Sequence, residues 1–179
     1  MKITISGTAA SGKSSVAKLL AKKLGYKHYS MGDLQRELAK EHNVDIVTWG
    51  EMEAEDDKYD RMIDQKQIDI GKNEDNFVID SWLGPKFVPD AVKICFDADI
   101  EVRAKRRLLH KRKEEKYENL DTVKQEMLKR EKINRDRWLK YYKFDYKDKN
   151  NFDLIIDSSD ISIEEAEDMV ESFLQKQKL

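Results

Sequence analysis

Short apolar runs alternate with longer amphipathic stretches along the chain. The runs are rich in β-branched and aromatic residues, as buried strands are, and they cover residues 2–6, 26–30, 76–80, 91–96 and 152–156. Apolar positions with helical spacing predict helices over residues 14–24, 32–41, 100 to about 116, 120–142 and 163–175, and one or two polar helices over 48–71. This alternation predicts an α/β fold with a parallel sheet and helices on both of its faces.

The charges are balanced overall but separated locally. The 179 residues include 34 basic and 36 acidic ones, a formal net charge of −2, which argues against a protein built mainly to coat nucleic acid. Basic residues gather within 102–112 and acidic ones within 51–64. Such local separation is expected around an anionic ligand, so we expect no nucleic-acid partner.

The cysteine content and the apolar runs set the expected compartment. Cys95 is the single cysteine, which rules out a disulfide within the chain. No apolar run approaches the roughly 20 residues that a membrane-spanning helix needs. We therefore expect a cytoplasmic monomer with no membrane partner.

A glycine-rich segment joins the first predicted strand to the first predicted helix. Its spacing, Gly7 and then Gly12-Lys13-Ser14 after four intervening residues, is that of a P-loop, in which backbone N–H groups surround phosphate oxygens. Lys13 is expected to reach the β- and γ-phosphates, and the Ser14 hydroxyl to bind Mg²⁺. The predicted triphosphate-binding residues are Gly7, Thr8, Ala9, Ala10, Ser11, Gly12, Lys13, Ser14 and Ser15.

The segment after the second predicted strand, Tyr-Ser-Met-Gly-Asp-Leu-Gln-Arg at 29–36, resembles the stretch that opens the acceptor helix of nucleoside monophosphate kinases. The resemblance implies that Arg36 holds the α-phosphate of the acceptor and that Ser30 lies near its base or ribose. Gly32 and Asp33 belong to the same acceptor-binding stretch. From the residues alone, Arg36 lies one helical turn in, where a bidentate phosphate contact is feasible. The alternative is a solvated helix arginine.

Asp80 ends the third predicted strand. An acidic residue at this place in P-loop proteins holds Mg²⁺. The resemblance implies the same role here, beside Ser14. An aspartate that only caps the following loop is the alternative.

Two arginine-rich segments, 100–107 and 130–137, resemble the helices that flank the lid of cytidylate kinases. About twenty polar residues separate them, which fits a short helical lid. With Lys13, the predicted catalytic residues are Arg106, Arg130 and Arg137, because cationic groups stabilise a transferring phosphoryl group. Whether Arg106 or Arg107 points inward stays open. A solvated basic face is preferred for Arg107, Lys111 and Arg112.

The whole pattern resembles the compact archaeal-type cytidylate kinases over about residues 1–160. The resemblance implies a P-loop NTPase fold with a five-stranded parallel sheet in the order 2-3-1-4-5. We expect one domain, 1–179. Its expected parts are a core (1–35, 74–105 and 140–179), a helical acceptor-binding insert (about 36–72) and a lid (about 106–135).

Two positions depart from that pattern. Trp82 stands where these kinases usually carry an arginine after strand three, and Lys86 substitutes for it or Trp82 stacks on a base. Asn134 stands where they usually carry an acidic residue, a candidate cytosine reader; its amide oxygen can still accept from the exocyclic amine. Trp82, Asn134 and Arg137 complete the predicted acceptor-binding set.

The predicted function is transfer of the γ-phosphoryl group of ATP to CMP or dCMP, with Mg²⁺. One alternative is an adenylate kinase-like enzyme, or another P-loop kinase whose acceptor is a small metabolite or an RNA end. A non-enzymatic nucleotide switch is a further alternative. The sequence contains no Asn-Lys-x-Asp guanine-reading motif, and the arginines predicted for the lid would be superfluous in a switch.

Overall fold

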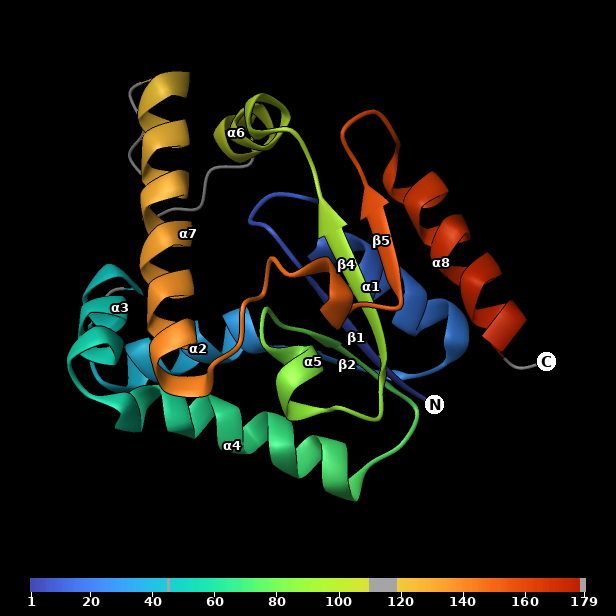
Figure 1. Cartoon of the computed structure of the whole chain (residues 1–179), viewed down its shortest axis with the longest axis horizontal. Helices are drawn as coiled ribbons and strands as arrows, with labels where there is room; N and C mark the ends of the chain where they lie inside the picture. Colours follow the sequence, from blue (N-terminus) through green and yellow to red (C-terminus); the bar gives the residue numbers. More distant parts are fainter. Residues whose placement is uncertain (45, 110–118, 178–179) are drawn as a thin grey trace.

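A computed structural model of the chain describes residues 1–44, 46–109 and 119–177. Its strands form one parallel sheet in the order β2-β3-β1-β4-β5, which confirms the predicted fold and strand order (Figure 1). The strands are β1 (Lys2–Gly7), β2 (Lys27–Ser30), β3 (Phe77–Asp80), β4 (Val92–Asp97) and β5 (Leu154–Asp157). Because all run the same way, their carboxyl ends share one edge of the sheet, where P-loop proteins bind nucleotides.

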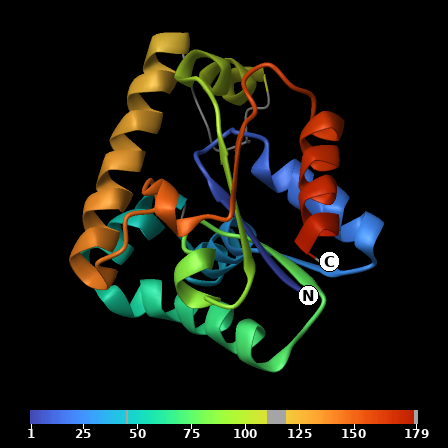
Figure 2. The same cartoon turned by 45° about the vertical axis from the view of Figure 1, so that its right-hand side comes forward.

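Helices cover both faces of the sheet (Figures 1 and 2). They are α1 (Lys13–Leu24), α2 (Met31–Glu41), α3 (Ile46–Glu55), α4 (Asp57–Asn73), α5 (Gly84–Phe87), α6 (Ile100–Leu109), α7 (Leu120–Tyr142) and α8 (Ile163–Gln177), with a short 3-10 helix at Lys149–Asn151. Helices α1 and α8 pack on one face, and α2 and α4 pack on the other. The long helix α7 stands beside α3 and the amino-terminal end of α4, opposite α8.

The two cores follow from the alternation of side chains along each strand. Ile3, Ile5 and Val78 face α1 and α8 in the larger core. Phe77 and Ile79, which flank Val78 in the sequence, face α2 and α4 in the second core. This two-sided burial explains why Phe77, Val78 and Ile79 form a continuous apolar run in β3.

Element boundaries agree with the predicted ones to within two residues, with three differences. The polar segment 48–71 is two helices, because the Asp56 side chain caps α4 by accepting from the Lys58 backbone N–H at 3.0 Å. Helix α5, with Pro85 in its first turn, was not predicted. The helix predicted over 100 to about 116 is described as far as Leu109, and the rest lies outside the described residues.

No helix in the described ranges is both long enough and apolar enough to cross a membrane.

Candidate active site

The P-loop turns sharply at the carboxyl end of β1. Gly7 has φ 132°, and a Cβ atom there would lie 1.9 Å from the Phe96 carbonyl oxygen, so only glycine fits. Gly12 has φ 86° and leads into α1. The loop thus brings its backbone to the N-terminus of α1, where N–H groups and the helix dipole favour phosphate.

Hydrogen bonds fasten this loop to the ends of two other strands. Thr8 donates from its backbone N–H to the Phe96 carbonyl at 3.1 Å and from its hydroxyl to Asp97 Oδ1 at 2.8 Å. The Ser158 hydroxyl, after β5, donates to the Ser11 carbonyl at 2.7 Å. These hydrogen bonds therefore fix the shape of the loop without a bound phosphate, and such preorganisation is what a phosphate-binding site needs.

The residues predicted to bind phosphate and Mg²⁺ meet at this edge of the sheet. The Lys13 ammonium lies 3.1 Å from Asp80 Oδ1 and 3.5 Å from the Ser14 hydroxyl. Asp80 is 3% exposed, and its Oδ1 accepts no hydrogen bond from the described residues. Ser14 and Asp80 fit Mg²⁺, because both offer oxygen ligands beside one phosphate-binding lysine and the Asp80 oxygen has spare acceptor capacity.

The predicted acceptor stretch begins helix α2. The Ser30 hydroxyl caps the helix by accepting from the Asp33 backbone N–H at 3.2 Å. Arg36 pairs with Asp33 and lies over Gly32, where an added Cβ would be 3.7 Å from Arg36 Nη1. Burial alone would raise the pKa of the Asp33 carboxyl, but Arg36 outweighs it and the pKa falls below its usual value. The guanidinium is thereby held at the N-terminal turn of α2.

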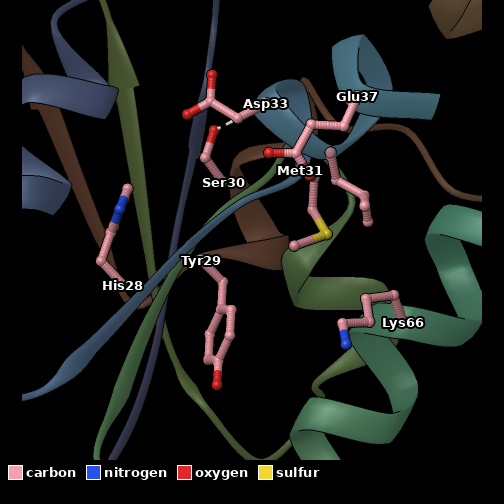
Figure 3. A pocket seen from close by; sticks show the side chains of 8 residues that line it. His28, Tyr29, Ser30, Met31, Asp33, Glu37 and Lys66 are labelled. Atoms are coloured by element: carbon pink, nitrogen blue, oxygen red, sulfur yellow. Dashed lines mark hydrogen bonds between the residues drawn. The ribbon is translucent and has the colours of Figure 1, made fainter. Parts of the chain in front are cut away.

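A solvent-open cavity of about 290 Å³ lies beside this helix (Figure 3). It is lined by His28, Tyr29, Ser30, Met31, Asp33, Leu34, Glu37 and Lys66. In Figure 3, Ser30 and Asp33 lie together at one end, with Lys66 across from them on α4. The cavity shares Ser30 and Asp33 with the predicted acceptor site, whereas Lys13, Asp80 and Arg36 do not line it.

Arg106, predicted to face the phosphates, contacts the loop after β5 in this structure. Its Nη2 donates to the Ser158 carbonyl at 2.6 Å, and its Nη1 lies 3.4 Å from the Ser158 hydroxyl. That same hydroxyl binds the Ser11 carbonyl of the P-loop. Arg106 therefore borders the nucleotide loop through Ser158, and its contact with phosphate stays a prediction.

Arg103 was not among the predicted site residues, yet it joins the P-loop to α7. It is 5% exposed and donates to the carbonyls of Ala98 at 2.9 Å and Ala9 at 3.4 Å. It also donates to Glu131 Oε1 at 2.5 Å, and Lys147 donates to the other Glu131 oxygen at 2.8 Å. One buried ion pair thus connects the phosphate-binding loop with the helix that carries the predicted acceptor arginine.

The predicted residues of α7 lie in different surroundings. Arg130 is exposed, Asn134 is half-buried and Arg137 is buried. Arg137 Nη2 lies 3.4 Å from Glu53 Oε2, and its Nε lies 3.2 Å from Asp60 Oδ2. The structure therefore brings Arg137 to carboxylates of α3 and α4.

Trp82 packs in an aromatic cluster between the end of β3 and α7. Its ring stacks on Tyr146 with centroids 5.0 Å apart and meets the edge of Trp138 at 5.2 Å. The buried Leu83 belongs to the same cluster, against which Phe87, Tyr142 and Phe144 also pack. This packing gives Trp82 a structural role, and its contact with an acceptor base stays a prediction.

Glu53, Asp60 and Asp64 form a buried acidic cluster around Arg137. Their exposed fractions are 3%, 4% and 6%. Glu53 accepts from Gln35 and Trp49, each at 2.8 Å, and Asp64 accepts from the Tyr142 hydroxyl. Burial raises the pKa of Asp60 to about 7 and that of Asp64 to about 6.

This cluster predicts a pH-dependent stability. Because the folded pKa of Asp60 exceeds the unfolded value of about 3.9, the folded chain binds more protons between the two values, and its free energy of unfolding falls as pH rises through that window. Asp60→Asn removes this titration. The free energy of unfolding of the variant minus that of wild type should therefore be larger at about pH 8 than at about pH 5. Urea unfolding at both pH values measures this difference, and Asp69→Asn, an exposed aspartate on the same helix, is the control. The same variant-minus-wild-type difference at pH 5 and at pH 8 would contradict the prediction.

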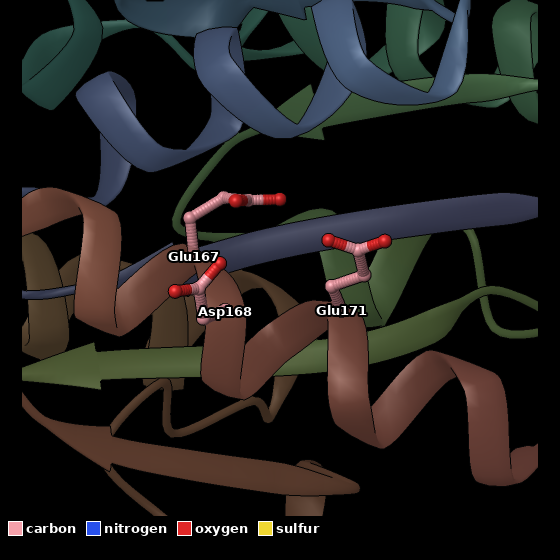
Figure 4. A group of neighbouring side chains, drawn as sticks. All are labelled: Glu167, Asp168 and Glu171. Carbon is pink, nitrogen blue, oxygen red and sulfur yellow. The ribbon is translucent and has the colours of Figure 1, made fainter.

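A second group of carboxylates lies away from this site. Glu167, Asp168 and Glu171 of α8 approach one another (Figure 4). The Lys23 ammonium of α1 pairs with all three, at 3.3 Å from Asp168 and 3.4 Å from Glu171. We interpret the group as the ion-pair contact that docks α8 on α1.

Comparisons with known proteins identify the family of this chain. Residues 2–160 match the model of the cytidylate kinase-like family. A cytidylate kinase of Sulfolobus acidocaldarius is 36% identical over 181 residues, covering 100% of this chain and 97% of the relative. One of Archaeoglobus fulgidus is 38% identical, covering 98% and 93%.

Solved structures show the same fold at low identity. A shikimate kinase from Aquifex aeolicus superposes with a TM-score of 0.64 at 20% identity, covering 100% of this chain and 99% of that one. A shikimate kinase from Bacteroides thetaiotaomicron gives 0.69 at 14% identity, covering 98% of each. These likenesses concern the fold, and the family follows from the sequence matches. The chain belongs to the cytidylate kinase-like family and is a P-loop kinase.

Proposed function

We propose that this protein is a (d)CMP kinase, which transfers the γ-phosphoryl group of ATP to CMP or dCMP. The observation that carries the proposal is the meeting of Lys13, Ser14 and Asp80 at the carboxyl edge of the sheet. Arg36 stands on the helix that follows the neighbouring strand β2. The named relatives, which span the whole chain, support cytidylate as the acceptor.

The chemistry is positioning together with cationic stabilisation. The acceptor phosphate is already anionic, so its oxygen attacks the γ-phosphorus without a strong base, and the bond to the β–γ bridging oxygen breaks to leave ADP. Lys13 stabilises the charge that develops on the phosphoryl oxygens, and Arg36 orients the acceptor phosphate. Mg²⁺, held by Ser14 and Asp80, supplies further charge neutralisation when bound.

The remaining predicted roles belong to the same proposal. Arg106, Arg130 and Arg137 contact the phosphates, and Ser30, Gly32, Asp33, Trp82 and Asn134 surround the acceptor. The acceptor-binding insert covers about 36–72. The lid over about 106–135, of which residues 110–118 lie outside the described residues, closes to exclude water. We place the protein in the cytoplasm as a monomer.

A panel of nucleoside monophosphates with ATP and Mg²⁺ tests the proposal. A coupled assay for ADP should show the highest kcat/KM with CMP or dCMP. Turnover of AMP alone would move the enzyme to the adenylate kinases. No turnover of any monophosphate would instead favour a small-metabolite acceptor.

Arg36→Lys should weaken the acceptor side selectively. A lysine keeps the charge but loses the bidentate contact, so kcat/KM for CMP should fall about 10- to 100-fold while KM for ATP changes little. Steady-state kinetics with each substrate varied in turn measures the split. Arg61→Lys on α4, an exposed arginine paired with Asp57, is the matched control and should leave both constants unchanged. A fall in kcat/KM for CMP matched by an equal rise in KM for ATP would contradict the assignment.

A further inference from the structure

The acidic cluster of Glu53, Asp60 and Asp64 has more acceptors than its neighbours satisfy. Among the described residues, Arg137 is the one cation that the structure pairs with it, through Glu53 and Asp60. Three carboxylates therefore face one guanidinium. The other donors are neutral groups of Gln35, Trp49 and Tyr142. A buried excess of acceptors is costly unless a donor supplied from elsewhere completes it.

Two acceptor atoms in this region are left without a hydrogen bond. Asp60 Oδ2 is ion-paired to Arg137 Nε at 3.2 Å but accepts no hydrogen bond from the described residues, and neither does Gln67 Oε1. Asp60, Asp64 and Gln67 are spaced four and three residues apart, so they share one face of α4. Gln67 is 1% exposed, so its unsatisfied amide oxygen is unfavourable as well.

The cluster adjoins the proposed acceptor site. Gln35, which donates to Glu53, precedes Arg36 on α2, and Arg137 reaches the cluster from α7. Figure 1 shows α2, α3, α4 and the carboxyl-terminal part of α7 gathered on one side of the sheet. A nucleotide whose phosphate is held by Arg36 would therefore have its base in the neighbourhood of these carboxylates.

The hydrogen-bonding edge of cytosine complements such a cluster. Its exocyclic amino group donates two hydrogen bonds, and carboxylates accept them. Uracil carries a carbonyl oxygen at the same ring position, which would face the ionised carboxylates with no donor between them. A buried polar mismatch of this kind discriminates far better than a difference in shape alone.

We infer that Asp60 and Asp64, with Glu53, are the base-selecting residues of the acceptor site and accept from the exocyclic amino group of cytosine. In this structure Arg137 pairs with Glu53 and Asp60. When cytosine binds, its amino group replaces the guanidinium at these carboxylates, and Arg137 turns toward the acceptor phosphate. The inference rests on the proposed function and adds the residues that set its base preference.

Asp60→Asn tests this inference, because it places an amide donor where the carboxylate accepted. Wild type should prefer CMP to UMP by at least about 100-fold in kcat/KM. In Asp60→Asn this preference should fall at least about tenfold, with CMP turnover lowered and UMP turnover maintained or raised. CMP and UMP share one ring size, so the comparison isolates the amino group from shape.

Three further measurements keep the outcome decisive. Asp69→Asn, an exposed aspartate on α4, is the matched control and should keep the wild-type preference. Asp64→Asn should lower the preference as well, which covers the case that Asp60→Asn does not fold. Thermal-shift titration with CMP and with UMP reports base preference without turnover.

The possible failures are distinguishable. If wild type uses no pyrimidine monophosphate, the proposed function fails, and the inference fails with it. If wild type prefers CMP but the folded variants lose CMP and UMP turnover equally, the cluster is only structural, and the inference is overturned while the proposed function stands.

Discussion

Lys13→Ala should lower kcat/KM for ATP about 10³-fold. The Lys13 ammonium already stands at the P-loop beside Asp80 and Ser14, so the side chain needs no rearrangement to meet the β- and γ-phosphates. Removing one preorganised charge from such a site costs on the order of 10²- to 10³-fold, and here the same change also leaves the buried Asp80 carboxylate without its cation. Steady-state kinetics with CMP held saturating measures the loss.

Lys22→Ala is the matched control for this prediction. Lys22 lies in the last turn of the same helix, α1, and is exposed. Its replacement should leave kcat/KM within about twofold of wild type, because a surface substitution away from the site costs little. A Lys13→Ala enzyme with near wild-type activity and unchanged ATP affinity would refute the assignment of the triphosphate site.

Glu131→Ala should destabilise the protein by about 3–5 kcal/mol. The change leaves Arg103 buried without its ion-pair partner, and an uncompensated buried charge costs that much. KM for ATP should rise as well, since Arg103 also holds the Ala9 carbonyl of the P-loop. Urea unfolding gives the free energy, and kinetics gives KM.

An exposed ion pair on the same helix supplies the control. Asp136→Ala breaks the pair with Lys132 and should cost less than about 1 kcal/mol. The double variant Arg103→Met with Glu131→Leu should regain much of the stability, because apolar side chains can replace a buried pair. It should keep the raised KM, since the contact with Ala9 is gone. Equal losses in Glu131→Ala and Asp136→Ala would show that the buried pair has no special role.

Features set by local sequence were predictable. The P-loop was found because its glycines and Lys13 are adjacent in sequence and fix a strand-turn-helix connection. Ser30 could be placed at the start of an acceptor helix, and it caps α2. The break between α3 and α4 stayed open, since polar residues on both sides gave no periodicity that separates one helix from two.

Features set by packing between distant segments were not predictable. Arg103 lies in a basic stretch typical of a solvated helix face, and its burial depends on Glu131, 28 residues away. The partners of Arg137 lie on α3 and α4, as far as 84 residues away. One signal was available: Asp60, Asp64 and Gln67 occupy the same helical face as Ile63 and Ile70, and polar residues at core positions point to a buried network.

Phosphoryl transfer to CMP is tested most directly by following ATP, Mg²⁺ and CMP with the enzyme by ³¹P NMR. We expect CDP and ADP signals to appear together and in equal amounts, with no free phosphate beyond the level without CMP. Release of inorganic phosphate without CDP would contradict it, because the P-loop would then serve hydrolysis and not transfer to an acceptor.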